Sequence, residues 1–326
     1  MKELFVKGMT YGWNTSRGAY RTKEAIDSLQ KLKETGSEWI ALSFFALQDT
    51  YCSTDIQFDY SHTMTDRDIQ FAVEQAKKLG LKVCLKPVVN CRDGIWRARI
   101  GFPEEATDKW EKWFRSYQSF LIHYAELATE LECEMFCIGC EMIQTEGQTA
   151  YWRQLIEQIR AIYHGPIIYN ANHGKEDGVE WFDAVDIIGT SAYYPVAKTP
   201  GDSVGNMVQE WQKIAIKLEK LHQTFHKPIL FMEIGCRSAF GCATMPWDFE
   251  HKDLPFSEEE QANFYESVFQ VFWNKPWFAG FFWWDWKAKL YPKEEAKKDL
   301  DFDIYGKKAE NIVKKWYSKH NITTHQ

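Results

Sequence analysis

Two short apolar segments of this chain each end on a single glutamate. The first leads to Glu141 and the second to Glu233. A carboxylate at the end of a buried strand costs free energy unless the protein uses its charge. One such glutamate alone is more typical of a solvated strand end or of a helix entry. Two of them on similar strands indicate a convergent pair of carboxylates, which is the minimal apparatus for breaking a glycosidic bond.

The elements that must position this pair follow a regular alternation of strands and helices. Strand-like segments lie near residues 6–9, 39–45, 82–88, 135–139, 167–169, 187–190, 229–232 and 280–284. Amphipathic helical patterns separate most of them, for example from Thr22 to Gly36 and from about residue 103 to about residue 131. Thr65 with Asp68, and Ser257 with Glu260, predict capping boxes at two helix starts. Only the connection between the fifth and sixth segments is short.

Alternating strands and helices imply a parallel sheet. Eight repeats predict a (β/α)8 TIM barrel, with a doubly wound sheet as the alternative. No linker or change in composition interrupts the chain, so a single catalytic domain over residues 1–326 is expected. In such a barrel the active site lies at the carboxyl-terminal ends of the strands. Polar and aromatic residues gather after the predicted strands, at Asn90, Trp96, Arg97, Asn170, Asn172, His173, Tyr193, Tyr194, Trp283, Trp284 and Asp285.

Composition argues against several other classes of protein. The chain has 326 residues, a formal net charge of -7 and scattered basic residues, which disfavours nucleic-acid binding. No apolar run approaches the ~18 residues of a membrane span. The start of the chain lacks the features of a signal peptide, so a cytoplasmic location is expected, or secretion if a leader has been removed. The C-x-x-C of Cys137 and Cys140 has no second pair at zinc spacing, so neither a metal nor another cofactor is expected.

The order and spacing of several motifs resemble one enzyme family. Glutamates after the fourth and seventh strands of an eightfold barrel are the mark of clan A glycoside hydrolases. Within the clan the chain resembles family 113, the endo-β-1,4-mannanases, over nearly its whole length. The motifs that carry the resemblance occupy residues 85–87, 92–97, 138–141, 151–153, 169–172, 192–195, 230–235 and 282–286.

Two positions depart from the clan pattern. Cys140 stands where most of the clan has an asparagine before the acid/base glutamate. Family 113 itself is expected to lack that asparagine, so this departure is consistent with the family. Val88 and Asn90 follow Lys86-Pro87 where a histidine and an aspartate would be expected. The contacts to the sugar at these positions must therefore differ, although the chemistry of the carboxylate pair need not.

The resemblance implies a retaining mechanism with Glu233 as nucleophile and Glu141 as acid/base, their carboxyl groups about 5–5.5 Å apart. Tyr194, or failing that Tyr193, would donate a hydrogen bond to Glu233. Trp283 or Trp284 would form the floor under the reacting sugar, because only one of two adjacent strand residues can face the barrel interior. The remaining expected substrate contacts are Trp13, Lys86, Asn90, Trp96, Arg97 and Asn172, with Trp247 as a further platform.

Several alternatives stay open from the sequence. Lys86 could simply pair with a glutamate, and Arg97 could anchor a loop. The implied substrate is β-mannan, glucomannan or manno-oligosaccharides, and the expected protein is a monomer. A clan A enzyme acting on a β-1,4-glucan, and a non-catalytic carbohydrate-binding barrel, are the rival interpretations. A lectin would use the same aromatic residues but would not need both glutamates.

Overall fold

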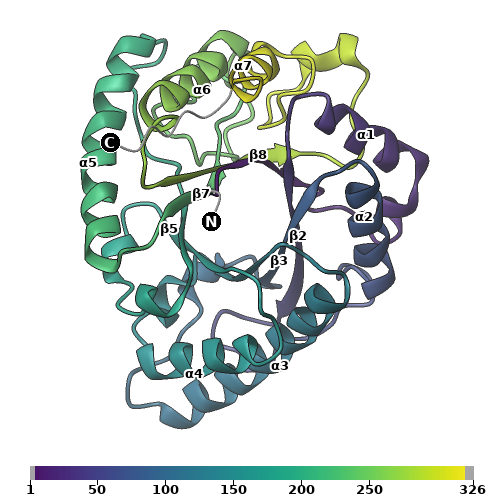
Figure 1. The fold of residues 1–326 in the computed structure, drawn as a ribbon, viewed down its shortest axis with the longest axis vertical. Coiled ribbons are helices and arrows are strands. Elements are labelled where there is room, and N and C mark those ends of the chain that lie inside the picture. The colour runs from purple at the N-terminus through teal and green to yellow at the C-terminus, as the bar shows by residue number, and fades with distance from the viewer. Residues whose placement is uncertain (1–3, 320–326) are drawn as a thin grey trace.

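The computed structural model describes residues 4–319, which form a closed barrel of eight parallel strands paired in chain order (Figure 1). The first and last strands pair with each other and close the ring. The strands are β1 (Val6–Tyr11), β2 (Trp39–Gln48), β3 (Lys82–Cys91), β4 (Met135–Cys140), β5 (Ile167–Asn172), β6 (Ile187–Ser191), β7 (Ile229–Ile234) and β8 (Phe278–Trp286). The predicted TIM barrel is therefore confirmed, and the doubly wound alternative is wrong.

The helices encircle this ring on its outer side (Figure 1). They are α1 (Lys23–Lys33), α2 (Asp66–Lys78), α3 (Thr107–Glu130), α4 (Thr149–Arg160), α5 (Val204–Phe225), α6 (Glu258–Phe272) and α7 (Lys308–Tyr317). The short connection between β5 and β6 contains no α-helix; two 3-10 turns, η4 (Glu176–Gly178) and η5 (Phe182–Ala184), stand where the sequence shows a weak helical pattern.

Two separate apolar cores follow from the alternation of side chains along the strands. Inward-facing residues fill the barrel, among them Trp39, Met135, Leu230 and Phe282. Outward-facing residues form a second, larger core between the strands and the helices. The inner core is the floor on which the cavity at the carboxyl-terminal end of the barrel rests, so side chains there are held by packing from below.

The two predicted capping boxes have different outcomes. At α2, Thr65 and Asp68 exchange both reciprocal hydrogen bonds, as predicted. At α6, Ser257 accepts from the backbone N–H of Glu260, but the Glu260 carboxylate does not return to Ser257. It accepts instead from the backbone N–H groups of Gly201 and Gly241, at 3.0 and 2.8 Å. The prediction at α6 is thus half wrong, because three unpaired loop N–H groups, including that of Ala243, compete for this carboxylate.

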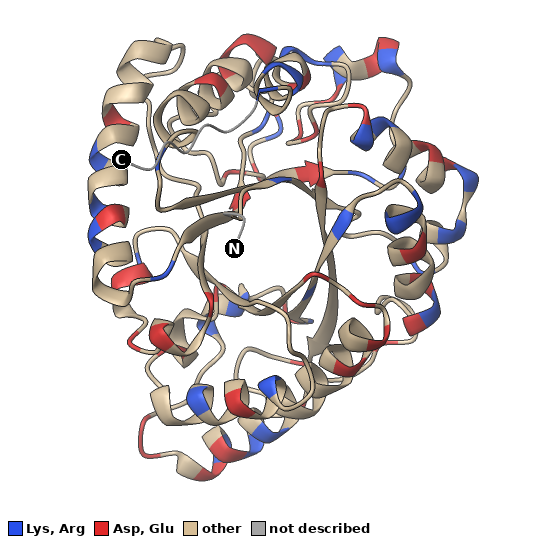
Figure 2. Ribbon diagram, viewed as in Figure 1, with Lys and Arg blue, Asp and Glu red and all other residues tan. Residues whose placement is uncertain are grey.

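Acidic and basic side chains are interspersed over the outer helices, and neither sign gathers on one side of the ring (Figure 2). No helix within residues 4–319 is both long enough and apolar enough to cross a membrane.

Candidate active site

A cavity of about 1380 Å³ opens at the carboxyl-terminal end of the barrel, and both glutamates predicted from the sequence line it. Glu141 follows β4 and Glu233 lies in β7. Both residues are largely buried, at 8% and 6% exposure. Other lining residues include Trp13, Trp96, Arg97, Cys140, Asn172, His173, Tyr193, Trp247, Trp284, Asp285 and Phe302. The barrel thus brings together two acids that are far apart in the sequence.

The carboxylate of Glu233 is held by a complete set of partners. The ammonium of Lys86 forms an ion pair with Oε1 inside the barrel. The Cys140 thiol and the Asn170 amide donate to the same oxygen, each at 3.3 Å, and the Tyr193 hydroxyl donates to Oε2 at 3.1 Å. Burial alone would raise the pKa of Glu233, but Lys86 and the other donors outweigh it and hold that pKa below its ordinary value. Glu233 is therefore charged at neutral pH and fixed in one orientation.

Glu141 has a different set of donors. Arg97 Nη1 and Trp96 Nε1 reach Oε2 at 2.8 and 3.3 Å, and Asn172 Nδ2 donates to Oε1 at 3.1 Å. The backbone of Glu141 has a φ of 55°, in the left-handed region that non-glycine residues seldom adopt. Such conformations persist only where the surrounding structure enforces them, and they cluster at functional sites.

Glu141 and Glu233 are connected in space through a single intervening residue, Cys140. Cys140 directly precedes Glu141 and contacts Glu233, so the ends of β4 and β7 face each other across the cavity. The glycine of the Ile138-Gly139-Cys140-Glu141 segment permits this approach. A Cβ at Gly139 would lie 2.8 Å from the Tyr169 ring and 3.0 Å from the Tyr117 hydroxyl oxygen. A side chain at this position would displace the segment that carries Glu141.

The two adjacent tryptophans of β8 lie on opposite sides of the strand, as expected. Trp284 lines the cavity and contacts Trp13, with ring centroids 5.3 Å apart. Trp283 is fully buried outside the barrel and stacks on Tyr265 of α6 at 3.9 Å. The assignment of Trp283 to the substrate site is therefore wrong, because the inward position of Phe282 turns its neighbour towards the helices.

The hydrogen bond predicted from Tyr194 to Glu233 is also wrong. Tyr193, the fallback residue, makes that bond. Tyr194 turns to the other side of β6, where its hydroxyl donates to Glu176 and its ring packs against Trp211. Because the two tyrosines lie just beyond the last residue of β6, strand alternation could not say which of them faces the cavity.

Lys86 and Asn90 were expected to touch substrate, but neither is a lining residue of the cavity. Lys86 is fully buried beneath the cavity and forms an ion pair with Glu233. Pairing with a glutamate was the alternative interpretation of Lys86 from the sequence. The side-chain oxygen of Asn90 accepts from Arg97 Nε at 3.0 Å, so Asn90 orients the guanidinium that contacts Glu141. Trp13, Trp96, Arg97 and Asn172 line the cavity, so their contact with substrate stays a prediction.

Replacing Lys86 by methionine should destabilise the fold and weaken the site together. The Glu233 charge would remain buried without its cation, which typically costs about 3–5 kcal/mol. The pKa of Glu233 should rise, so the acidic limb of any pH–activity profile should move to higher pH. Urea unfolding and the pH profile measure the two effects. A matched change at Lys112, whose partner Asp108 is an exposed neighbour on α3 at 3.6 Å, should alter stability by less than about 1 kcal/mol.

One supporting network was not found from the sequence. The Tyr169 hydroxyl accepts from the backbone N–H of Met142 at 3.1 Å and donates to Glu146 at 2.6 Å. Met142 directly follows Glu141, so this network fixes the segment that presents the Glu141 carboxylate. Burial raises the pKa of Glu146 to about 7. The sequence offered a signal in Tyr169 and Asn170, which lie in β5 within a motif of the family, but it did not reveal their partners.

Tyr169→Phe should lower cleavage about tenfold, because Met142 N–H loses its acceptor and the Glu141 segment loosens. The loss should be larger for substrates with poor leaving groups than for aryl glycosides with good ones, since only the former need a well-placed proton donor. Tyr163→Phe is the matched control, because its hydroxyl donates to the backbone oxygen of Cys133 far from the cavity. An equal loss of rate for all leaving groups would show that the substitution does not act through the placement of Glu141.

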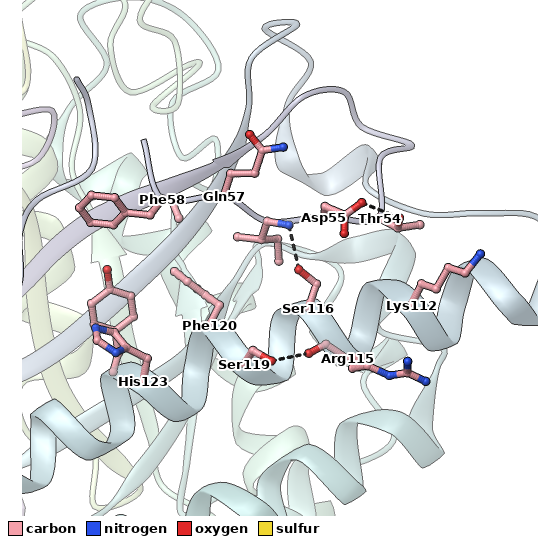
Figure 3. A pocket seen from close by; sticks show the side chains of 13 residues that line it. Thr54, Asp55, Gln57, Phe58, Lys112, Arg115, Ser116, Ser119, Phe120 and His123 are labelled. Carbon is pink, nitrogen blue, oxygen red and sulfur yellow. Dashed lines mark hydrogen bonds between the residues drawn. The ribbon is translucent and has the colours of Figure 1, made fainter. Parts of the chain in front are cut away.

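A second, smaller hollow of about 770 Å³ lies outside the barrel, between α3 and the loop after β2 (Figure 3). The backbone N–H of Ile56 donates to Ser116 Oγ at 2.8 Å and ties that loop to the helix. Arg115 at its rim is paired with Glu111 of the same helix. Neither glutamate of the barrel cavity borders this hollow.

The barrel and its cavity define a class of protein. A closed eightfold parallel barrel with two glutamates converging at the carboxyl-terminal end of its strands is the architecture of a barrel glycoside hydrolase. The profile of Glycoside Hydrolase Family 113 matches residues 9–307. The chain belongs to this family.

Solved structures agree with this assignment. The chain is similar to the GH113 β-mannanase AaManA from Alicyclobacillus acidocaldarius in complex with ManMIm, with 40% identity, a TM-score of 0.90, and coverage of 97% of this chain and 98% of that one. It is similar to a GH113 β-1,4-mannanase complex at 37% identity, with a TM-score of 0.89 and coverage of 97% and 100%. A β-glucuronidase of Faecalibacterium prausnitzii, at 14% identity and a TM-score of 0.65, shares the fold alone. A comparison of this sequence with curated proteins found no match.

Proposed function

We propose that this protein is a retaining β-1,4-mannanase that cleaves mannan, glucomannan or manno-oligosaccharides. The observation that carries the proposal is the shared cavity of Glu141 and Glu233, in a chain of Family 113 whose similar solved structures are β-1,4-mannanases. The two glutamates have distinct surroundings, as two chemical roles require. Glu233 is charged and pinned by Lys86, whereas Glu141 meets the guanidinium of Arg97 at the cavity wall.

In this mechanism the Glu233 carboxylate attacks the anomeric carbon while the glycosidic C–O bond breaks. Glu141 gives its proton to the departing oxygen, and a glycosyl ester of Glu233 remains. Glu141 then takes a proton from water, the water oxygen attacks the anomeric carbon, and Glu233 leaves as a carboxylate. Two inversions restore the original configuration. The Tyr193 hydroxyl and Lys86 would stabilise the nucleophile before and after each cycle.

The tryptophans Trp13 and Trp284 supply apolar faces suited to the C–H face of a sugar ring. Trp96 and Asn172 carry donors beside Glu141, where hydroxyls next to the scissile bond would lie. We propose Trp247, which stacks on His173 at the cavity rim, as a further platform. A monomeric state and a cytoplasmic location stay predictions.

The test is a product profile on mannohexaose, cellohexaose and xylohexaose, with proton NMR of the first anomer formed. Cleavage of mannohexaose with a β-configured first product is expected. Cleavage of cellohexaose alone would replace the mannanase assignment by a glucanase. An α-configured first product would contradict the double displacement. Binding without turnover, unchanged by Glu141→Gln and Glu233→Gln, would identify a carbohydrate-binding barrel instead.

A further inference from the structure

The mechanism above gives no role to Asp285, a buried acid in the cavity wall. Asp285 follows Trp284 in β8, is 8% exposed and lines the cavity. Among the partners that residues 4–319 offer, its carboxyl forms neither a hydrogen bond nor an ion pair. Its carboxyl oxygens are not among the fully enclosed unpaired atoms of the described residues, so they open onto the cavity, where a ligand can reach them. A ligand in the cavity would supply the missing partner.

Burial and the neighbouring charges together set the protonation state of Asp285. Asp299, Asp301 and Asp303 lie nearby, and Lys287 is the neighbouring cation. Lys287 is already paired with Asp301 at 3.2 Å. Burial, reinforced by Asp303, raises the pKa of Asp285 to about 8. At neutral pH the side chain is therefore a carboxylic acid, able to donate one hydrogen bond and to accept others.

The other titratable groups that face Asp285 do not change this. Tyr193 and Tyr265 lie close enough to feel its charge, and burial raises the pKa of each well above its ordinary value. Lys307, behind Asp303, is paired with Asp299 at 3.0 Å. A neutral acid with both donor and acceptor capacity matches a sugar hydroxyl, which also donates and accepts.

The barrel order places Asp285 on one side of the scissile bond. β8 pairs with β7, which carries Glu233, and with β1, whereas Glu141 follows β4 across the ring. The departing sugar must lie at Glu141, because its oxygen receives the proton there. The wall formed by β8 and β1, with Trp284 and Trp13 in contact, therefore faces the sugar that remains on Glu233 and the units beyond it.

We propose that Asp285 is a substrate-contacting residue whose neutral carboxyl donates a hydrogen bond to, and accepts one from, hydroxyls of the glycone on the β8 side of the cavity. This inference rests on the proposed glycosidase function. It adds a residue whose contribution is lost when the side chain becomes either apolar or charged.

The test measures binding of mannohexaose by calorimetry in a Glu141→Gln background, which lacks the proton donor and so turns the ligand over slowly. At about pH 6.5, adding Asp285→Ala should weaken binding about tenfold or more, the usual effect of losing a buried hydrogen-bonding partner. Adding Asp285→Asn should change it by less than about threefold, because an amide has the same shape and also donates and accepts. Asp108→Asn, on the exposed face of α3, is the control and should leave binding unchanged.

The pH dependence separates a neutral acid from a merely structural side chain. In the Glu141→Gln background the affinity should fall as the pH rises through about 8, and this fall should be absent with Asp285→Asn added. Burial raises the pKa of Cys140 well above its ordinary value and lowers that of His173, so neither titrates near pH 8. Glu146 and Asp303, with pKa values of about 7 and about 6, are present in both proteins, so the difference between the two pH profiles reports Asp285.

Thermal unfolding gives a second readout that needs no ligand. Unfolded Asp285 releases its proton near 3.8, whereas folded Asp285 keeps it to about 8. Raising the pH across this interval therefore favours the unfolded chain, and the melting temperature of the wild type should fall more between those values than that of Asp285→Asn.

Unchanged affinity in the alanine variant would overturn the inference, as would an asparagine variant that binds as weakly as the alanine variant. Failure of the proposed function looks different. If the Glu141→Gln parent binds cellohexaose rather than mannohexaose, the substrate is reassigned, and the same three variants then test Asp285 on the glucan.

Discussion

Glu233→Ala should lower cleavage of manno-oligosaccharides by about 10⁴-fold or more, because removal of a nucleophile abolishes the covalent route. The space vacated by the carboxylate can admit a small anion. With an activated aryl β-mannoside, azide should restore turnover and give the α-mannosyl azide, since azide attacks from the face that Glu233 occupied. Proton NMR of the azide product checks this outcome.

The design needs a control for general damage. Glu157→Ala, on the exposed face of α4, removes a glutamate without touching the barrel and should retain full activity. The Glu233 variant also leaves Lys86 buried without its carboxylate, so its unfolding free energy should fall as well. Turnover that survives in a folded Glu233→Ala protein, or a β-configured azide product, would refute the nucleophile assignment.

Glu141→Ala should lower the cleavage of mannan by about 10²–10⁴-fold, the usual contribution of general acid–base catalysis. The size of the loss should depend on the leaving group. A dinitrophenyl mannoside departs without a proton, so its first step should remain fast while hydrolysis of the glycosyl-enzyme becomes slow. A burst of dinitrophenolate and a mannosylated protein in the mass spectrum are the expected signs.

Azide distinguishes the two glutamates once more. In the Glu141 variant it should attack the glycosyl-enzyme from the open side and give the β-mannosyl azide, the opposite configuration to that from the Glu233 variant. An equal loss of rate for good and poor leaving groups would show that Glu141 does not handle the proton.

Local sequence was sufficient for the fold and for the position of the acid pair. Alternating strand and helix patterns predict the barrel, because each strand must bury both faces and each helix one stripe. Glu141 and Glu233 stand out since each ends an apolar run, and the barrel fold then places strand ends together. The resemblance to the family then implied the retaining mechanism and the separate roles of the two glutamates. Trp13, Trp96, Arg97 and Asn172 were found in the same way, by their place after strands.

Tertiary structure decided which of two residues adjacent in sequence faces the cavity. Tyr193 and Tyr194 lie beyond β6, where strand alternation no longer applies, and the packing of Tyr194 against Trp211 turns Tyr193 inwards. The ion pair of Lys86 with Glu233 joins residues 147 positions apart and exists only because the barrel closes. The acids that act on Asp285 lie only 14 to 18 residues further along the chain, but it is the folding of the segment after β8 that brings them close to it. Local sequence determines which side chains lie at strand ends, whereas contacts and protonation depend on neighbours that only folding brings together.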